Sequence, residues 1–337
     1  MKAMVLKKIA QVETKPLELE ELPIPKPDSN EILIKVSTCG ICHTELDEIE
    51  GRKKPKLPVV LGHEVIGYVD RLGSKIKKFK VGDRVGVAWI YSSCGRCKFC
   101  TSGRENLCPD FKATGCDADG GYEEYMVVSE KFAYLIPDIF SDFEAAPLMC
   151  AGAIGYRALK LTGIKDGENI GLYGFGASAH IVIQLVKHLY PKSKVFVFTR
   201  RKNDDPSKLA KEKGADWVGI SGDTSPKKID RAIDTTPVGI PVVEALRNLE
   251  KGGRLVINAI RKETKIPELD YAEHLWNEKE IKSVANITRN DVQEFLQLAA
   301  EIPIKSEIKL FRLEEANDAL IALKNGRYRG AGVLKIN

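Results

Sequence analysis

Residues 169–199 read NIGLYGFGASAHIVIQLVKHLYPKSKVFVFT, and their pattern indicates how the middle of the chain folds. The run 169–173 is short and apolar, as in a buried strand, and 174–179 is a tight glycine loop. The apolar residues that follow recur every four positions, which is typical of one helix face, and 194–199 resembles another strand. A strand, a glycine loop, a helix and a second strand in this order predict a βαβ unit of a Rossmann-type, doubly wound parallel sheet.

The glycine loop of this unit is a candidate dinucleotide site. Gly174 and Gly176 permit close approach of the backbone to a pyrophosphate, and Ala179 is an allowed residue at the third position of the fingerprint. The N-terminus of the following helix can receive the phosphate charge. A glycine loop alone could be an ordinary strand-to-helix turn, but the flanking elements favour dinucleotide binding.

The end of the second strand bears on the choice of cofactor. An NAD enzyme places an acidic residue about 20 residues after the fingerprint to bind the ribose hydroxyls. Thr199, Arg200 and Arg201 stand there instead. A carboxylate would repel a 2'-phosphate, whereas the Thr199 hydroxyl and two guanidinium groups would attract it, so we expect NADP to be preferred over NAD. The alternative is that the arginines form a solvated strand end.

Four of the eight cysteines lie within fifteen residues, CGRCKFCTSGRENLC, as Cys94, Cys97, Cys100 and Cys108. Four thiolates at this spacing can close a tetrahedral zinc site that leaves no open position, which predicts a structural zinc. An iron–sulfur cluster is the main alternative, because Pro follows the last cysteine, although the seven-residue gap before it disfavours a cluster. Unliganded thiols are the other alternative.

Further potential metal ligands are scattered through the chain. Cys42 follows the strand-like run EILIKVS, His63 and Glu64 follow the apolar run LPVVL, and Cys150 stands in APLMCAGAIGY. Each alone is weak evidence, because a single buried cysteine or histidine is more often part of a core than a ligand.

Taken together, these motifs resemble the zinc-dependent alcohol dehydrogenases of the medium-chain dehydrogenase/reductase superfamily. The resemblance rests on CGICHTEL at 39–46, the GHE segment at 62–85, the four-cysteine loop, Cys150 and the glycine loop. It covers essentially the whole chain. It implies oxidation of alcohols to aldehydes or ketones with a nicotinamide cofactor, and two zinc ions per chain.

The resemblance implies a role for each of several residues. Cys42, His63 and Cys150 would bind a catalytic zinc, Glu64 would exchange onto the metal, Glu45 would orient the histidine, Thr44 would take the alcohol proton, Asp47 would stand where many relatives have the histidine that ends the proton relay, and Trp89 and Ile49 would line the substrate pocket. Because Asp47 replaces that histidine, the relay ends either on its carboxylate or in water. For Trp89, core packing is the alternative.

The resemblance also implies the domain organisation. A mainly β, GroES-like catalytic domain would comprise 1–151 and 283–337, with a zinc lobe at 91–110, and a Rossmann domain would comprise 152–282. In relatives an arginine near the C-terminus often binds the pyrophosphate. Ala331 appears at that position here, with Arg329 two residues earlier.

Composition limits the remaining possibilities. The chain has 337 residues, 43% of them hydrophobic, a net charge of +5 and no dense basic block, so nucleic acid is a poor candidate partner. The first residues contain no apolar signal region, which predicts a cytoplasmic protein. We expect no membrane partner, a small-molecule alcohol or aldehyde as substrate, and a homo-oligomer, a tetramer or a dimer. The alternatives are a reductase of activated alkenes or quinones, and a zinc-knuckle protein that binds nucleic acid.

Overall fold

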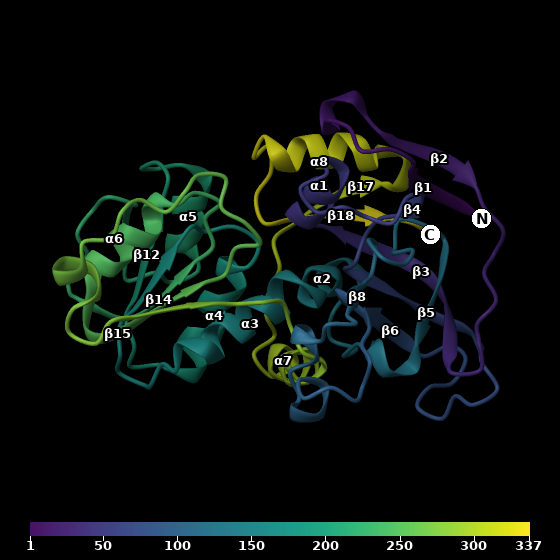
Figure 1. The fold of residues 1–337 in the computed structure, drawn as a ribbon, viewed down its shortest axis with the longest axis horizontal. Coiled ribbons are helices and arrows are strands. Elements are labelled where there is room, and N and C mark those ends of the chain that lie inside the picture. Colours follow the sequence, from purple (N-terminus) through teal and green to yellow (C-terminus); the bar gives the residue numbers. More distant parts are fainter. The chain divides into compact units, whose positions relative to one another are not determined.

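The computed structural model describes residues 1–337, which form two compact units. The first unit comprises Met1–Cys150, Asn286–Ala300 and Lys305–Asn337, and the second comprises Ala151–Ala285 and Glu301–Ile304. Figure 1 shows the course of the chain through both. No helix is long and apolar enough to span a bilayer.

The first unit is mainly β. Its seven-stranded sheet contains β3 (Glu31–Ile41), β5 (Val65–Leu72), β6 (Arg84–Val87), β9 (Tyr125–Ser129), β10 (Ala133–Leu135), β17 (Ile308–Arg312) and β18 (Ala331–Lys335). The strand order is β10-β6-β5-β3-β18-β17, and β9 also pairs with β3. Smaller sheets are formed by β1 (Lys2–Leu6), β2 (Leu17–Glu21) and β4 (Val59–Val60), and by β7 (Ile90–Ser92) and β8 (Lys112–Ala113). The unit's helices are α1 (His43–Ile49), α2 (Asp142–Ala145), α7 (Arg289–Glu301) and α8 (Ala316–Lys324).

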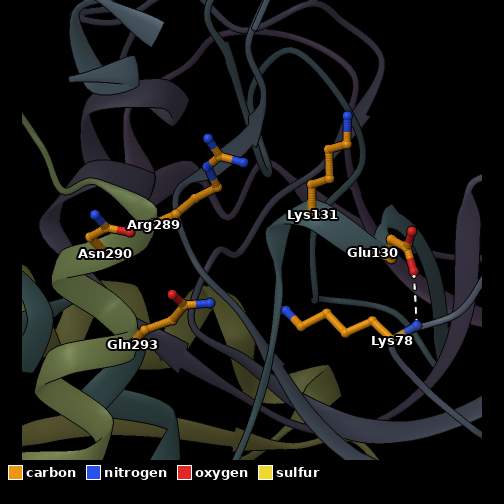
Figure 2. Close-up of a pocket in the computed structure, with 6 residues that line it drawn as sticks. All are labelled: Lys78, Glu130, Lys131, Arg289, Asn290 and Gln293. Carbon is orange, nitrogen blue, oxygen red and sulfur yellow. Dashed lines mark hydrogen bonds between the residues drawn. The ribbon is translucent and has the colours of Figure 1, made fainter. Parts of the chain in front are cut away.

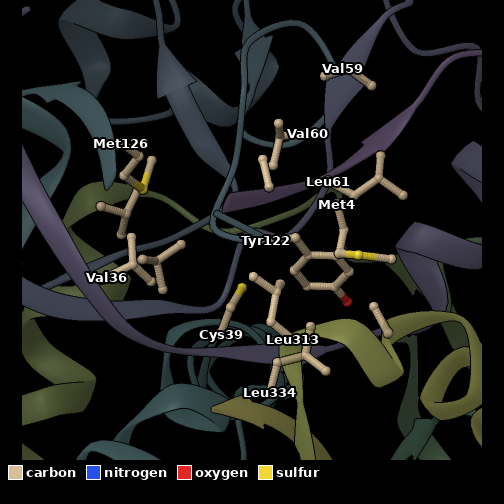
Figure 3. Packing of buried hydrophobic residues seen from close by; sticks show 14 of the residues in the cluster. Met4, Val36, Cys39, Val59, Val60, Leu61, Tyr122, Met126, Leu313 and Leu334 are labelled. Atoms are coloured by element: carbon tan, nitrogen blue, oxygen red, sulfur yellow. The ribbon is translucent and has the colours of Figure 1, made fainter. Parts of the chain in front are cut away.

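The core of this unit lies along β3, the strand with the most neighbours. Apolar side chains of β3 pack with residues from the small sheet, from β9 and from the C-terminal strand. Figure 3 shows the ring of Tyr122 among Met4, Leu61 and Cys39. Burial of this apolar surface stabilises the sheet and fixes the positions of the loops that leave its strands.

The second unit contains a six-stranded sheet in which every pairing is parallel, with the order β13-β12-β11-β14-β15-β16. The strands are β11 (Ile170–Tyr173), β12 (Val195–Thr199), β13 (Trp217–Ile220), β14 (Ile229–Asp234), β15 (Leu249–Ile257) and β16 (Glu280–Ser283). The helices are α3 (Ala151–Thr162), α4 (Ala179–Leu189), α5 (Asp205–Glu212) and α6 (Ile240–Asn248), and Tyr271–Leu275 is a short π-helix. Figure 1 shows α3 and α4 on one face of the sheet and α5 and α6 on the other. The predicted fold class, a Rossmann sheet with a GroES-like β domain, is confirmed.

Candidate active site and metal centres

Sheet register brings Cys42 and His63 together. Cys42 directly follows β3, and His63 lies two residues before β5. The two strands are antiparallel and pair Cys39 with Val65, so the end of one lies beside the start of the other. The backbone N–H of Gly40 donates to the Glu64 carbonyl at 2.9 Å, which continues the ladder into the GHE segment.

Cys150 reaches the same place from a third segment. It follows the 3₁₀ turn Ala146–Met149, whose last residue packs on β6. A Cβ atom at Gly86 would lie 2.7 Å from the Met149 sulfur, so the absence of a side chain there lets the turn approach the strand. The ligand atoms of Cys42, His63, Glu64 and Cys150 all lie within 4.8 Å of one another.

A carboxylate holds the histidine from behind. Glu45 Oε1 lies 2.6 Å from His63 Nδ1, and Glu45 Oε2 accepts the backbone N–H of Cys42 at 2.8 Å, which also caps α1. The opposite ring atom, His63 Nε2, is buried and has no hydrogen-bond partner. An imidazole fixed in this way presents one free nitrogen, which together with two thiols is a donor set that Zn²⁺ accepts.

The pKa shifts of this set show that groups able to carry negative charge are crowded together in a buried place. Contact with Cys150 and with His63 holds the pKa of the Cys42 thiol well below its usual value, despite burial. Burial lowers the pKa of His63, but Glu45 and Cys42 outweigh it and leave that pKa well above the ordinary range. Burial raises the pKa of Glu64, and the nearby Cys42 raises it further. These groups therefore suit a cation at their centre.

Gly40 explains how Glu64 fits beside the ligands. A Cβ atom at Gly40 would lie 1.9 Å from Glu64 Oε2, so only glycine leaves room for this carboxyl. Glu64 is 2% exposed, and its Oε2 atom has no hydrogen-bond partner. The sequence alone does not mark Gly40 as part of the site, because the close approach depends on the pairing of β3 with the GHE segment.

The proton-relay candidates lie on α1. The Thr44 hydroxyl is 3.5 Å from Cys42 Sγ, and its side chain is almost fully buried. Asp47, three residues later and on the same side of the helix, accepts a hydrogen bond from Arg52 Nε at 2.6 Å. Ile49 packs into the hydrophobic core of the first unit, and its role in a substrate pocket stays a prediction.

Trp89 lies against the histidine, as the register of the sheet requires. Val87 at the end of β6 pairs with Val65, so the residue two positions after Val87 lies beside the residue two positions before Val65. The Trp89 ring contacts the His63 ring edge-on, with centroids 4.8 Å apart. Its position suits both substrate contact and packing of the histidine.

The four-cysteine cluster is separate and is built from one loop. The sulfur atoms of Cys94, Cys97, Cys100 and Cys108 lie within 4.8 Å of one another. The Cys94 sulfur accepts the backbone N–H of Cys97 at 3.4 Å, and backbone N–H groups of Arg96 and Cys97 lower its pKa to about 6. Such a nest of thiols fits a closed tetrahedral metal site.

The nucleotide candidates lie at the carboxyl edge of the parallel sheet of the second unit. Gly174 directly follows β11 with a φ of 85° and lies against the side chain of Thr235, whereas Gly176 faces open space. Ala179 begins α4. This loop has the geometry in which a Rossmann fold receives a pyrophosphate.

Contrary to the expectation, the Thr199 hydroxyl is not available to a 2'-phosphate. This hydroxyl already bonds to the Arg201 carbonyl at 3.0 Å, to Ser207 Oγ at 3.1 Å and to the Gly219 carbonyl at 3.3 Å. It therefore holds the turn after β12 and is not free for a ligand. Arg200 and Arg201 are exposed, and Lys202 and Lys211 line a cavity of about 100 Å³ at this strand end.

A groove of about 400 Å³ in the first unit lies apart from the metal ligands. It is lined by Lys78, Glu130, Lys131, Arg289, Asn290 and Gln293, as Figure 2 shows. The Arg289 guanidinium is paired with Glu105 at 2.9 Å, and Lys78 donates to the Ala133 carbonyl at 2.7 Å. None of the residues expected to take part in the chemistry lines it.

Comparison with known proteins agrees with this geometry. Residues 28–138 match the family model of the alcohol dehydrogenase GroES-like domain. The chain is 42% identical over 346 residues to the Mycobacterium tuberculosis protein described as "Probable alcohol dehydrogenase AdhA", which covers 100% of this chain and 97% of the relative.

The chain belongs to the zinc-dependent alcohol dehydrogenase family. An alcohol dehydrogenase of Geobacillus stearothermophilus is 37% identical, over 96% of this chain and 97% of its own. A cinnamyl alcohol dehydrogenase of Sorghum bicolor has a solved structure that superimposes with a TM-score of 0.88 at 27% identity, over 99% of this chain and 97% of the other. The activity of the chain is that of the family, NAD(P)-dependent oxidation of alcohols.

Proposed function

We propose that this alcohol dehydrogenase binds two zinc ions, one for catalysis at Cys42, His63 and Cys150, and one for structure at the four-cysteine loop. The observation that carries the first assignment is the buried His63 ring, which offers a ligand atom within 4.8 Å of those of two thiols and a carboxylate and whose Nε2 atom has no hydrogen-bond partner. Three protein ligands leave a position for substrate, whereas the four thiols of the loop leave none. Chemistry is therefore assigned to the first unit and cofactor binding to the second.

At the catalytic site Zn²⁺ supplies a Lewis acid that lowers the pKa of an alcohol. Side chains of the protein orient the histidine ligand, transfer the proton and provide an exchangeable ligand. Glu45 fixes the tautomer and the orientation of His63 through its 2.6 Å contact with Nδ1. Thr44 Oγ1 accepts the alcohol proton and passes it outward, to the Asp47 carboxylate or to water. Glu64, held close by Gly40, is near enough to exchange with a ligand.

NADP is the proposed cofactor. The turn after β12 carries no ribose-binding carboxylate, and Arg200 and Arg201 are exposed, with Lys202 next in the chain. Since the Thr199 hydroxyl is already bonded, recognition of a 2'-phosphate falls to the arginines. Charge-assisted hydrogen bonds of about 1.5 to 3 kcal/mol each give roughly tenfold discrimination or more.

Two measurements test the proposal. Elemental analysis should find two zinc ions per chain in the wild type, and a count of one, or iron, would refute the metal assignment. The ratio of kcat/KM for NADP to that for NAD should fall in Arg200→Ala. Arg247→Ala, an exposed arginine before β15 at the opposite sheet edge, is the matched control and should leave the ratio unchanged. Equal kcat/KM values for both cofactors in the wild type would show that Arg200 and Arg201 lie in solvent and do not bind the 2'-phosphate.

Cytoplasmic location and a homo-oligomeric state stay predictions. None of the eight cysteines forms a disulfide, which suits a reducing compartment. Size-exclusion chromatography with light scattering would give the number of subunits.

A further inference from the structure

An ammonium group lies beside the proposed catalytic site. Lys53 Nζ lies 5.3 Å from the centre of the Trp89 ring, whose centroid is itself 4.8 Å from that of His63. The two distances together place the ammonium no more than about 10 Å from the metal-ligating ring. The backbone N–H of Lys53 donates to the Asp47 carbonyl at 3.0 Å, which anchors the residue just after α1.

No carboxylate neutralises this ammonium. The other acidic groups at and after α1 have their own cations: Glu45 is paired with His63, Asp47 with Arg52, and Glu50 with Arg52 and Lys324. Lys53 forms no ion pair and rests against an aromatic face instead. A cation over tryptophan keeps a favourable contact there while its charge remains available.

The remaining acid of α1, Glu48, does not cancel the charge. Its side chain is fully buried, and neither carboxyl oxygen has a hydrogen-bond partner. Burial raises the pKa of Glu48 well above its usual value, and the neighbouring Glu45 raises it further, which favours the uncharged form of this carboxyl. Cys116, which interacts with Glu48, packs in one small cluster with Trp89. Of the four residues Trp89, Lys53, Glu48 and Cys116, which form one wall, Lys53 is the cation, and it forms no ion pair with Glu48.

We propose that Lys53 selects alcohols that carry a carboxylate, which lies along Trp89 and pairs with the Lys53 ammonium while the hydroxyl reaches the catalytic site. This inference rests on the proposed catalytic role of Cys42, His63 and Cys150. A single ammonium matches one carboxylate in charge, whereas a phosphate is better served by several cations or an arginine fork. The substrate class is short hydroxy acids, oxidised to the oxo acid with reduction of one dinucleotide and release of one proton.

The test compares matched substrates. For the wild type we expect kcat/KM to be roughly tenfold higher for 5-hydroxypentanoate than for 1-pentanol, which corresponds to one charge-assisted hydrogen bond. Lys53→Met should remove the preference, Lys53→Arg should retain most of it, and Lys53→Glu should reverse it. Lys54→Met, the exposed neighbouring lysine, is the control and should leave the ratio unchanged. No preference in the wild type, or a preference that survives Lys53→Met, would overturn the proposal.

Binding without turnover separates this inference from the proposed function. Pentanoate cannot be oxidised at a hydroxyl, and calorimetry should show that it binds the wild type at least several-fold more tightly than Lys53→Met. If no alcohol is oxidised by the zinc-loaded enzyme but pentanoate binding depends on Lys53, the proposed function fails and the carboxylate site stands. If alcohols are oxidised but pentanoate binds both proteins equally, the carboxylate site fails and the proposed function stands.

Discussion

The four-cysteine loop draws all its sulfur atoms from fifteen consecutive residues, whereas Cys42, His63 and Cys150 come from three segments of the chain. Closing a short loop costs little chain entropy, so the loop needs only a few tight turns. Gly95 and Gly103, with φ near 70°, make two of them. The second set depends on the register of the large sheet and on the turn before Cys150. The four-cysteine cluster can therefore stabilise local structure, whereas the set of Cys42, His63 and Cys150 exists only once the core of the first unit has formed.

The two clusters also differ in what surrounds them. Cys94 and Cys97 are partly exposed, and the sulfur atoms of Cys94 and Cys108 each accept a backbone N–H. His63 and Glu64 are buried, with a further carboxylate behind the histidine. A histidine, a carboxylate and a free position give one site the groups that acid–base chemistry requires, and four thiolates give the other only charge and geometry.

Loss of a catalytic ligand should have the largest effect. We expect Cys150→Ala to reduce kcat by roughly 10³-fold or more, because the Lewis acid contributes several kcal/mol to the barrier. The variant should retain one zinc ion and most of its thermal stability. Cys39→Ala, which removes a buried thiol of the core that ligates nothing, is the control for cysteine loss and should keep both ions. An active Cys150→Ala enzyme would contradict the assignment.

Cys97→Ala should show the reverse pattern. Structural zinc contributes folding free energy, so we expect the free energy of unfolding to fall by several kcal/mol and the 94–108 loop to become sensitive to protease. The kcat per folded molecule should change little, since the loop holds no substrate. Differential scanning calorimetry and active-site titration on the same sample measure both quantities. If Cys97→Ala and Cys150→Ala lost only stability, the division between the two sites would be wrong.

Thr44→Ala should reduce kcat by roughly 10²-fold, within the range for a positioned proton transfer. Thr44→Ser keeps the hydroxyl and should reduce kcat only slightly. Zinc content and Tm should stay at wild-type values, which distinguishes a lost relay from a lost metal.

Asp47→Asn tests where the relay ends. A changed pH profile of kcat would place the proton on this carboxylate, and an unchanged profile would show that it leaves through water.

Local patterns were readable from the sequence, and contacts across the sheet were not. The segment 169–199 predicted a strand, a loop, a helix and a strand, and β11, α4 and β12 lie within it. The cysteine spacing predicted a cluster because its members are neighbours in the chain. Gly40 beneath Glu64 and Lys53 over Trp89 were missed, since each depends on strand pairing. Lys53 lies in the run RKKPK, where charge alone indicates only a solvated surface.

The carboxylate behind the histidine gives the smallest and most specific test of the difference between the clusters. Glu45→Gln keeps the size of the side chain but removes the charge that faces His63 Nδ1 at 2.6 Å. Loss of such an outer carboxylate typically costs about 10- to 100-fold in metal affinity, so a graded chelator should remove one zinc ion much earlier than from the wild type. The second ion, in the four-cysteine loop, should leave at its wild-type concentration, because no carboxylate supports it. Glu18→Gln, an exposed carboxylate on β2, should change neither step. If both ions left earlier in Glu45→Gln, the carboxylate would act on the stability of the whole unit, and the two clusters would not be independent.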